Sequence, residues 1–347
     1  MTHKVAVIRG DGIGPEITDA TIEILTAAGA DIDWQDVPVG LDAEALTGEP
    51  LPWSSVSRLL ELGVVLKAPL LAGRRTGGVS VCQDGVTRHH PSINNALRRE
   101  LGSFVNVRPV RGWQGLSGKY ADMDLVIMRE VTEDMYCGVE TQIDEDTAHA
   151  TKIITGTASR RIAKFSCDYA ERFGRRKVMA VHKANVLHLT DGLFLESVRQ
   201  VVAGYPRLQF EEQAIDAACF LAVKKPHIFD VVVCPNQYGD IFSDLAAALV
   251  GSLGLAPGAN IGERTAMFEA AHGAAPDIAG KGTANPIGLA LSGALLLDHI
   301  GQTQAADRVR AGIGDLLESG RALTPDLGGT ATTREFTEAV CTATQCV

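Results

Sequence analysis

The stretch "FDVVVCPNQYGDIFSDLAAALV", residues 229–250, decides the fold of this chain. It begins with an apolar, β-branched run that is typical of a buried strand, and its later part has the periodicity of a helix, predicted over 240–252. Asp240 and Asp244 stand four residues apart, so their carboxylates share one face of the first helical turns. Two acids this close either balance the helix dipole or hold a cation between them.

The alternation of strand and helix continues along the chain in both directions. Further strands are predicted in "HKVAVIRG", "GVVLKAP", "DLVIMRE" and "KVMAVHKA". Helices are predicted within 11–28 and over 157–173, 190–203, 216–224, 287–299 and 304–319. Because several strands are apolar on both faces, the pattern favours an α/β architecture with a largely parallel sheet.

Two segments depart from this alternation. Residues 136–154 are polar, β-branched and poor in helix formers, which predicts a hairpin arm that completes an interface. Residues 70–92 are rich in glycine and basic residues, which predicts a long surface loop. The chain contains no low-complexity linker and no internal repeat, so if it has two domains they must be closely joined.

Composition restricts the class of protein. A chain of 347 residues that is 46% hydrophobic can bury a large core. Its net charge of −10 argues against a nucleic-acid or anionic membrane surface. Without a long apolar segment or a signal-peptide pattern, the chain is expected to stay in the cytosol. The seven cysteines form no CxxC pair, which indicates reduced thiols and neither a disulfide framework nor a zinc site.

Charged residues at the ends of predicted strands are candidates for function. Lys183 and Arg129 each stand at the carboxyl end of an apolar run, where open α/β sheets bind their ligands. From position alone, each is either a surface residue with a buried stem or a functional cation. Tyr136 follows Arg129 closely.

A second group of candidates lies within the run "SINNALRRELGSFVNVRP", residues 92–109. Arg98 and Arg108 offer forked donors that suit carboxylates, although Arg98 is equally consistent with a solvated helix residue. Ser92 and Asn94 are residue types that begin helices.

Two glycine-containing segments invite a nucleotide interpretation. "GDGIG", residues 10–14, lacks the spacing of a dinucleotide fingerprint, so a tight turn is the better reading. "EAAHGAAPDIAGKGTANP", residues 269–286, contains His272 and Asp277 in an irregular context. Glycine there permits close backbone approach to a nucleotide, and a plain connecting loop is equally consistent.

Seven ordered segments of the chain resemble the isocitrate and 3-isopropylmalate dehydrogenase family of β-decarboxylating dehydrogenases. They are "GDGIGPEI", "LRRELGSFVNVRPV", "REVTEDMYCGVE", "HKANV", "IDAACF", "NQYGDIFSD" and "HGAAPDIAGKGTANP". The match covers nearly the whole chain, and "NQYGDIFSD" is its most specific part.

The resemblance implies an isopropylmalate dehydrogenase-like α/β/α fold. A discontinuous large domain that binds cofactor would comprise residues 1–102 and 251–347, and residues 103–250 would form a small dimerisation domain. The arm near 136–154 would then be a clasp between the subunits of a homodimer.

The resemblance also implies a reaction and its participants. Asp240 and Asp244 of one chain and Asp216 of the other would hold Mg²⁺ or Mn²⁺ in a shared site. Lys183 would reach the partner's site and deprotonate the substrate hydroxyl, Tyr136 would protonate the enol, and the Asp277–Ile278 pair looks like that of the NAD type. The implied residues are, for catalysis, Lys183 and Tyr136; for substrate, Ser92, Asn94, Arg98, Arg108 and Arg129; for metal, Asp216, Asp240 and Asp244; and for NAD, Asn185, His272, Gly273, Asp277, Ile278 and Asn285.

The substrate is less closely indicated. Ser92-Ile93-Asn94 looks like the Ser-x-Asn of isocitrate enzymes, but residues 70–92 replace the family's "TP-x-GGG" stretch with a longer basic segment, so a threonine contact has no clear equivalent. Its basic residues either receive a more anionic isostere such as 3-(phosphonomethyl)malate or only solvate a loop. They are Arg74, Arg75, Arg88, His89 and His90.

Isocitrate and its phosphonate isostere are therefore placed ahead of homoisocitrate, 3-isopropylmalate, D-malate and tartrate. A catalytically silent regulatory subunit is the alternative of another class. Such subunits tend to lose base or metal residues, whereas this chain keeps Lys183, Tyr136, Asp216, Asp240 and Asp244. The retained set favours an enzyme.

Overall fold

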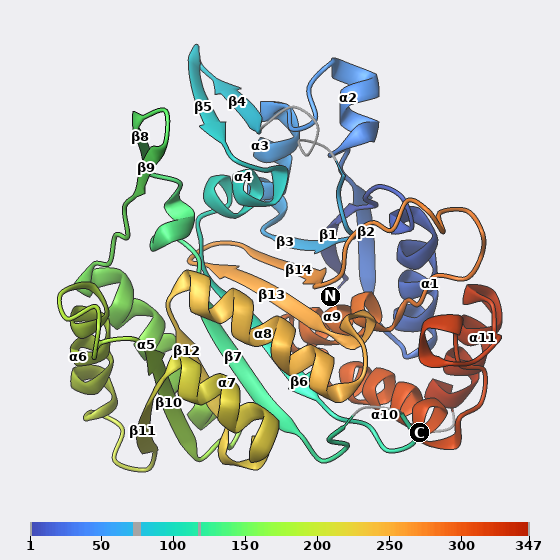
Figure 1. Cartoon of the computed structure of the whole chain (residues 1–347). Coiled ribbons are helices and arrows are strands. Elements are labelled where there is room, and N and C mark those ends of the chain that lie inside the picture. Colours follow the sequence, from blue (N-terminus) through green and yellow to red (C-terminus); the bar gives the residue numbers. More distant parts are fainter. Residues whose placement is uncertain (1, 72–77, 117–118, 346–347) are drawn as a thin grey trace. The chain divides into compact units, whose positions relative to one another are not determined.

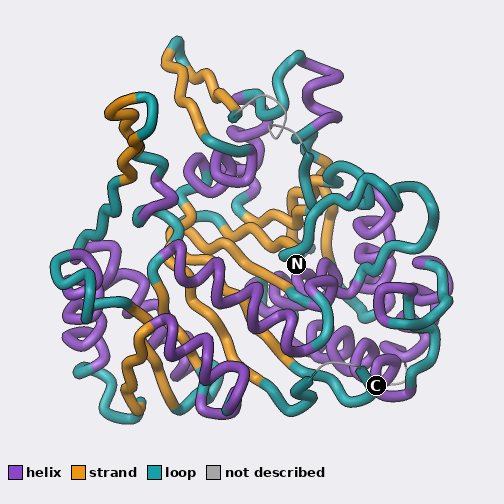
Figure 2. Tube along the Cα trace, viewed as in Figure 1, coloured by secondary structure: helices purple, strands orange, loops and turns teal. Residues whose placement is uncertain are grey.

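The computed structural model describes residues 2–71, 78–116 and 119–345, and the chain divides into two compact units. Unit 1 consists of Met1–Ser103, Trp113–Ala121 and Gly251–Val347, and unit 2 of Phe104–Gly112 and Asp122–Val250. Figure 1 labels the elements of both units, and Figure 2 shows strands and helices alternating within each. The predicted α/β class is confirmed.

Unit 1 is built on five strands in the order β13, β14, β3, β1, β2. The strands β14 (Ala266–Ala270), β3 (Val64–Lys67), β1 (His3–Ile8) and β2 (Ile32–Asp36) pair in parallel. β13 (Pro257–Gly262) pairs antiparallel with β14. Because helices cover this sheet, its central strands read as continuous apolar runs rather than as alternating ones.

One hydrophobic cluster of unit 1 is formed mainly by α1 (Gly14–Ala27), α9 (Ile287–His299), α10 (Thr303–Ser319) and α11 (Thr333–Gln345). α1 and α11 come from opposite ends of the chain, yet they pack side by side, as Figure 1 shows in blue and red. Nearly every residue of α9 is buried, so this helix has no polar face of its own.

A second cluster of unit 1 joins alternate residues of β1, Ala6 and Ile8, to α3 (Trp53–Leu62) and α4 (Ile93–Glu100). Residues two apart on a strand share a face, so β1 directs this pair to one cluster and its other side chains away from it. α2 (Leu41–Thr47) precedes α3. α4 is amphipathic, with Ile93, Ala96 and Leu97 buried, and this leaves its polar residues on the opposite face.

Unit 2 has strands in the order β11, β10, β12, β7, β6. β11 (Gln209–Ala214), β10 (Lys177–His182), β12 (Val231–Cys234) and β7 (Asp124–Glu130) are parallel, and β6 (Ser103–Arg111) is antiparallel to β7. Arg129 and Lys183 lie at or just beyond the carboxyl ends of β7 and β10.

Two pairs of helices accompany this sheet. α5 (Gly156–Arg172) packs with α6 (Thr190–Val202), and α7 (Ile215–Lys224) packs with α8 (Asn236–Val250). These bounds confirm the predicted helices, as do α1, α9 and α10 in unit 1. α8 begins at Asn236, earlier than the predicted 240, because it follows the end of β12 almost at once.

Two hairpins stand apart from the main strands. The predicted arm contains β8 (Glu140–Asp144) and β9 (Thr147–Ala150), which pair antiparallel, and every residue of both strands is exposed. A short 3-10 helix, η1 (Met135–Cys137), comes just before this hairpin. The hairpin expected in this segment is therefore confirmed, and its part in an interface stays a prediction.

The prediction of a long loop over 70–92 was wrong for its described part. Residues 78–92 contain the antiparallel strands β4 (Val79–Gln83) and β5 (Val86–His90). Asp84 and Gly85 connect them with positive φ angles of 50° and 80°. An Asp-Gly pair in this conformation is the preferred two-residue hairpin turn, and it carries the chain straight back into β5.

Among the described residues, no helix combines the length and the apolar character needed to cross a membrane. The expected cytosolic location stays a prediction.

Candidate active site

The first turns of α8 bring the two predicted metal ligands next to two arginines of unit 2. Arg129, at the end of β7, contacts the Asp240 carboxylate through Nη1 and donates to the Asn236 Oδ1 atom from Nε at 3.0 Å and from Nη2 at 2.8 Å. Arg108, on β6, lies 3.4 Å from Asp240 and 3.5 Å from Asp244. Arg108, Arg129, Asp240 and Asp244 therefore form one cluster of alternating charge.

Gly239 permits the close packing of this cluster. A Cβ atom at this position would lie 2.7 Å from Cβ of Arg129, which is closer than side chains tolerate. The glycine therefore lets α8 approach the end of β7 and brings Asp240 within reach of the Arg129 guanidinium.

Tyr136 lies beside the same cluster. It is on η1, and the Arg129 guanidinium carbon stands 5.6 Å from the centre of its ring. Burial, and then the negative charge of Asp240, raise the pKa of the Tyr136 phenol above its usual value. The phenol therefore stays protonated at neutral pH.

Lys183 and Asp216 form a separate pair in unit 2. The Lys183 ammonium lies 2.7 Å from Asp216 Oδ1, and the Asp216 side chain is 68% exposed in the first turn of α7. The hydrogen bond from Lys183 lowers the pKa of the Asp216 carboxyl. Asn185, the predicted nicotinamide contact, is exposed two residues beyond Lys183.

The three predicted metal ligands do not gather within one chain. Across residues 2–71, 78–116 and 119–345, no group of three or more His, Cys, Asp or Glu side chains could hold a metal ion. Asp240 and Asp244 share a site, whereas Asp216 belongs to the Lys183 pair. This separation agrees with ligands drawn from two chains, and the shared metal site stays a prediction.

The predicted substrate residues of unit 1 lie on α4. Ser92 is the N-cap of this helix, and its hydroxyl accepts from the Asn95 backbone N–H at 3.2 Å, so the capping interpretation also holds. Asn94 Oδ1 is buried and has no hydrogen-bond partner among the described residues. Arg98 donates from Nε to Asn260 Oδ1 and from Nη2 to Glu269 Oε1, both at 2.9 Å.

Arg98 is held in place by a buried network that sequence reasoning missed. Glu269 on β14 accepts from the Lys67 ammonium of β3 at 2.6 Å and from Asn260 Nδ2 at 2.6 Å. The Lys67 and Glu269 side chains are only 2% and 8% exposed. Burial opposes the Glu269 charge, but Lys67 and Arg98 outweigh it and hold the pKa of the carboxyl well below its usual range. The only indication of this network in the sequence is that Lys67 and Glu269 are charged residues within apolar runs.

The predicted adenosine residues occupy the segment after β14. His272 Nδ1 lies 3.0 Å from the Gly273 carbonyl oxygen, whereas its Nε2 atom is buried without a hydrogen-bond partner in the described part of the chain. Burial lowers the pKa of this imidazole, so it is neutral at physiological pH. Asp277 is exposed and Ile278 is half-buried. Asn285 is buried and donates to Asp326 Oδ2 at 2.9 Å.

The basic side chains of the β4–β5 hairpin have partners within the chain. Glu100, the last residue of α4, accepts from Arg88 Nε at 2.8 Å and Nη2 at 2.6 Å, and it lies 2.9 Å from His90 Nε2. His89 Nδ1 lies 2.8 Å from the Ser80 hydroxyl. These contacts attach the hairpin to α4. Arg74 and Arg75, also expected to be functional, lie outside the described residues.

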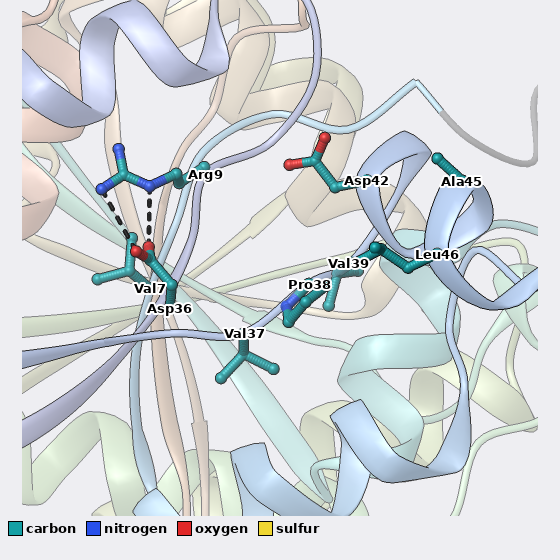
Figure 3. Close-up of a pocket in the computed structure, with 9 residues that line it drawn as sticks. All are labelled: Val7, Arg9, Asp36, Val37, Pro38, Val39, Asp42, Ala45 and Leu46. Carbon is teal, nitrogen blue, oxygen red and sulfur yellow. Dashed lines mark hydrogen bonds and ion pairs between the residues drawn. The ribbon is translucent and has the colours of Figure 1, made fainter.

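Figure 3 shows a separate pocket of about 380 Å³ in unit 1. It is lined by Val7 of β1 and Arg9 just beyond that strand, by the end of β2 and the residues after it, and by α2, and none of the predicted site residues lines it. The Arg9 side chain points to Asp36 and donates to it from Nε at 2.9 Å, and it also pairs with Asp19 at 2.6 Å. The charge of Arg9 in this pocket is therefore already balanced by two carboxylates.

Comparisons with known proteins identify the family of this chain. The family model described as isocitrate/isopropylmalate dehydrogenase matches residues 4–340. The Arabidopsis thaliana protein named isocitrate dehydrogenase (NAD) catalytic subunit 6, mitochondrial, is 42% identical over 97% of this chain and 87% of its own length. The 3-isopropylmalate dehydrogenase of Archaeoglobus fulgidus is also 42% identical, over 97% of this chain and 98% of its own.

A solved structure shares the fold. The crystal structure of isocitrate dehydrogenase from Methylococcus capsulatus superposes with a TM-score of 0.90 at 39% identity, covering 99% of this chain and 100% of that one. The fold, the family model and the relatives agree over almost the whole length. The chain belongs to the isocitrate/isopropylmalate dehydrogenase family.

Proposed function

We propose that this enzyme catalyses the NAD-dependent oxidative decarboxylation of a 3-substituted (R)-malate, with isocitrate as the first candidate. The products would be a 2-oxo acid, CO₂ and NADH. The observation that carries the proposal is the cluster of Arg108, Arg129, Asp240 and Asp244 beside a protonated Tyr136. This cluster offers cations for substrate carboxylates and an acid for the last proton transfer. The Arabidopsis relative, named as an NAD enzyme, supports the cofactor.

The donor set at α8 fits Mg²⁺ or Mn²⁺. Asp240 and Asp244 provide only carboxylate oxygens, which are the ligands these hard cations prefer, and their side chains are 35% and 65% exposed. Asp216 of a second chain would complete the protein ligands. When bound, such an ion supplies Lewis-acid chemistry that favours oxidation of a hydroxy acid.

The segment after β14 fits the adenosine half of NAD. The buried His272 Nε2 atom has a hydrogen-bonding capacity that no described residue satisfies, and a ligand could supply the missing partner. An added Cβ at Gly273 would meet nothing within 4 Å, so the backbone there is open to close approach. The exposed Asp277 carboxylate can accept from ribose hydroxyls and would repel a 2′-phosphate, which favours NAD over NADP. Ile278, Asn285 and Asn185 complete the proposed cofactor contacts.

The proton transfers fall to two side chains. Lys183 would accept the proton of the substrate hydroxyl, and bound NAD would supply the hydride-acceptor chemistry for the oxidation. The resulting β-keto acid loses CO₂ and leaves an enol, and Tyr136 would protonate its carbon. Arg98, Arg108 and Arg129 would bind carboxylates of the substrate throughout.

We further propose a homodimer formed through unit 2, with the β8–β9 arm as a clasp and unit 1 as the cofactor-binding part. Large apolar side chains are exposed beside the proposed shared residues: Leu189 near Lys183 is 87% exposed, Phe220 on α7 is 62% and Ile241 on α8 is 53%. Exposed apolar side chains that gather in one patch usually belong to an interface, and we propose that these three do. A second chain covering them would bring Lys183 and Asp216 toward its own metal ligands.

The substrate's third substituent is proposed from α4. Ser92 and Asn94 are polar, which suits the carboxylate of isocitrate better than the isopropyl group of isopropylmalate. The main support for a phosphonate arm was the basic hairpin, but Arg88 and His90 are already paired with Glu100. Isocitrate therefore comes first, and 3-(phosphonomethyl)malate remains the second candidate to be assayed.

The test is an NADH-formation assay with Mg²⁺ or Mn²⁺ against isocitrate, 3-(phosphonomethyl)malate, homoisocitrate, 3-isopropylmalate, D-malate and tartrate. We expect isocitrate to give the highest kcat/KM and NADP to replace NAD poorly. Highest activity with 3-isopropylmalate would overturn the interpretation of Ser92 and Asn94. Absence of turnover with every substrate, despite tight substrate binding, would instead indicate a regulatory subunit.

The role of Lys183 has a separate test. Lys183→Met should abolish turnover while leaving the far-UV circular dichroism spectrum unchanged, because it removes the base and keeps the length of the side chain. Wild-type turnover by this variant would refute the assigned role.

A further inference from the structure

The segment between β9 and α5 places a lysine in the interior of unit 2. Lys152 is 10% exposed, and its ammonium nitrogen lies 2.6 Å from Asp191 Oδ1 and 3.4 Å from Asp134 Oδ1. Both carboxylates are completely buried, at 0% exposure. The ammonium also stands 4.3 Å from the centre of the Tyr238 ring. One buried cation is therefore shared by two buried anions and an aromatic face.

Each of the two carboxylates also accepts a hydrogen bond from the backbone of a different segment. The second oxygen of Asp191 accepts from the backbone N–H of Lys183 at 2.6 Å, just beyond the end of β10. The second oxygen of Asp134 accepts from the backbone N–H of Gln237 at 2.8 Å, in the first turn of α8. Asp134 is also the N-cap of η1, the short helix that carries Tyr136.

We propose that Lys152 is a positioning residue for the reaction: its ammonium holds Asp191 and Asp134 together and thereby fixes the backbone at Lys183, at Tyr136 and at the start of α8. This inference rests on the proposed function, which gives those elements their roles. Lys152 itself touches none of the proposed catalytic or metal-binding side chains in the contacts described, so it acts through the two aspartates.

The charge of Lys152 is suited to a permanent rather than a switchable role. Burial disfavours the ammonium, but the close ion pair with Asp191 and the charge of Asp134 outweigh burial and raise the pKa of Lys152 above its usual value. The ammonium is therefore charged over the whole range in which the enzyme would work. Asp134 also has a φ of 78° with a ψ of −162°, a backbone conformation that is essentially restricted to glycine, so the surrounding contacts must hold it there.

The test compares kcat for Lys152→Met, Asp191→Asn and the double variant, all in the full chain, with the substrate of highest turnover. Each kcat is normalised to the folded fraction measured by circular dichroism. We expect a loss of about a hundredfold in kcat for Lys152→Met, because displacing a reacting group by about 1 Å has an effect of this size. KM for NAD should change less than kcat, since the proposed adenosine contacts all lie in unit 1 and only Asn185 follows Lys183 closely in the chain.

The matched control is Lys164→Met on α5. Lys164 also pairs with an aspartate, Asp168, at 2.6 Å, but both side chains are exposed, at 67% and 51%. This variant should keep wild-type kcat. Asp191→Asn should reproduce much of the Lys152 defect, and the double variant should be no slower than the worse single variant, because the two residues act as one unit.

Three outcomes would overturn the inference: wild-type kcat in folded Lys152→Met, wild-type kcat in Asp191→Asn, or defects that multiply in the double variant. If Lys152→Met does not fold, Asp191→Asn decides alone, because asparagine retains the shape of the aspartate. Lys183→Met separates this inference from the function beneath it. An active Lys183→Met enzyme refutes the proposed role of Lys183, whereas an inactive one together with a fully active Lys152→Met refutes only the positioning role.

Discussion

Replacing Glu269 with glutamine should destabilise unit 1 strongly, although the two side chains have nearly the same shape. In the wild type, Glu269 Oε1 accepts from Arg98 and Asn260, and Oε2 accepts from the Lys67 ammonium. A glutamine can keep its carbonyl oxygen toward Arg98 and Asn260. Its amide then points two further N–H donors at Lys67, which is 2% exposed and cannot turn to water.

The expected loss follows from this burial. Removing one partner of a buried ion pair leaves an uncompensated charge and destabilises by about 3–5 kcal/mol. Divided by a urea m-value of about 2–3 kcal/mol/M, this corresponds to a fall of roughly 1–2.5 M in the unfolding midpoint. The difference in the free energy of unfolding between wild type and Glu269→Gln should also depend on pH, because the pKa of Glu269 is lowered in the folded protein.

The sign of this dependence is fixed. A carboxyl with a lowered pKa stabilises the fold fully above its unfolded pKa of about 4.3 and loses that contribution as pH falls toward the folded value. The difference in the free energy of unfolding between wild type and Glu269→Gln should therefore be constant around neutral pH and should decrease progressively below about pH 4.3.

Tryptophan fluorescence is the appropriate assay. All three tryptophans, Trp34, Trp53 and Trp113, belong to unit 1, so urea titration followed by their emission reports the unfolding of that unit. Glu263→Gln, at an exposed acid between β13 and β14, is the matched control and should shift the midpoint little. A midpoint unchanged in Glu269→Gln at neutral pH would refute the view that this ion network supports the fold.

Two other predictions concern the hairpin and the thiols. Glu100→Gln should free the β4–β5 hairpin from α4 and speed its cleavage by trypsin at Arg88, because the bonds from Arg88 and His90 outweigh burial, lower the pKa of Glu100 and keep its carboxylate charged. The control variant Glu61→Gln, in an exposed ion pair, should leave the cleavage rate unchanged. Equal cleavage rates in wild type and both variants would contradict the anchoring of the hairpin by Glu100. Thiol reagents should label exposed Cys82 rapidly and spare Cys167, since burial raises the pKa of the Cys167 thiol to about 12. If the fast labelling phase kept its full amplitude in Cys82→Ser, Cys82 would not be the reactive thiol.

Much of the fold was predictable because its helices carry strong periodicity. The prediction over 287–299 coincides with α9, and that over 304–319 differs from α10 by one residue at its start. The error at α8 arose because Asn236–Gly239 has no apolar repeat and contains a glycine, so nothing local marked those residues as helical. In this case the preceding strand and the contact with Arg129 determine where the helix begins.

The β4–β5 hairpin was missed although its signal was present. "VSVCQDGVTRHH" has two β-rich runs on either side of Asp84-Gly85, the residue pair that most favours a two-residue turn. The glycine and arginine content of the segment was interpreted as that of a loop instead. The function expected for Arg88 and His90 depended on that loop, and their pairing with Glu100 removes the reason for it.

The candidate site was predictable in its side chains and not in their support. Segments that resemble the family pointed to Arg129, Lys183 and Asp240, whose roles stay proposals. Lys152 lies in a polar arm and finds its carboxylates in segments distant in sequence, so only the folded chain reveals the contact. Local patterns do not record pairings of this kind.

Gly239 has a consequence for how such an enzyme can diverge. Even the methyl group of alanine would collide with the Arg129 side chain, which lies 2.7 Å from the place that Cβ would occupy. A mutation there would delete no ligand, acid or base, and yet it would force the guanidinium and the helix apart. Evolution can exchange substrate-facing residues around this point, whereas the point itself is constrained by steric exclusion alone.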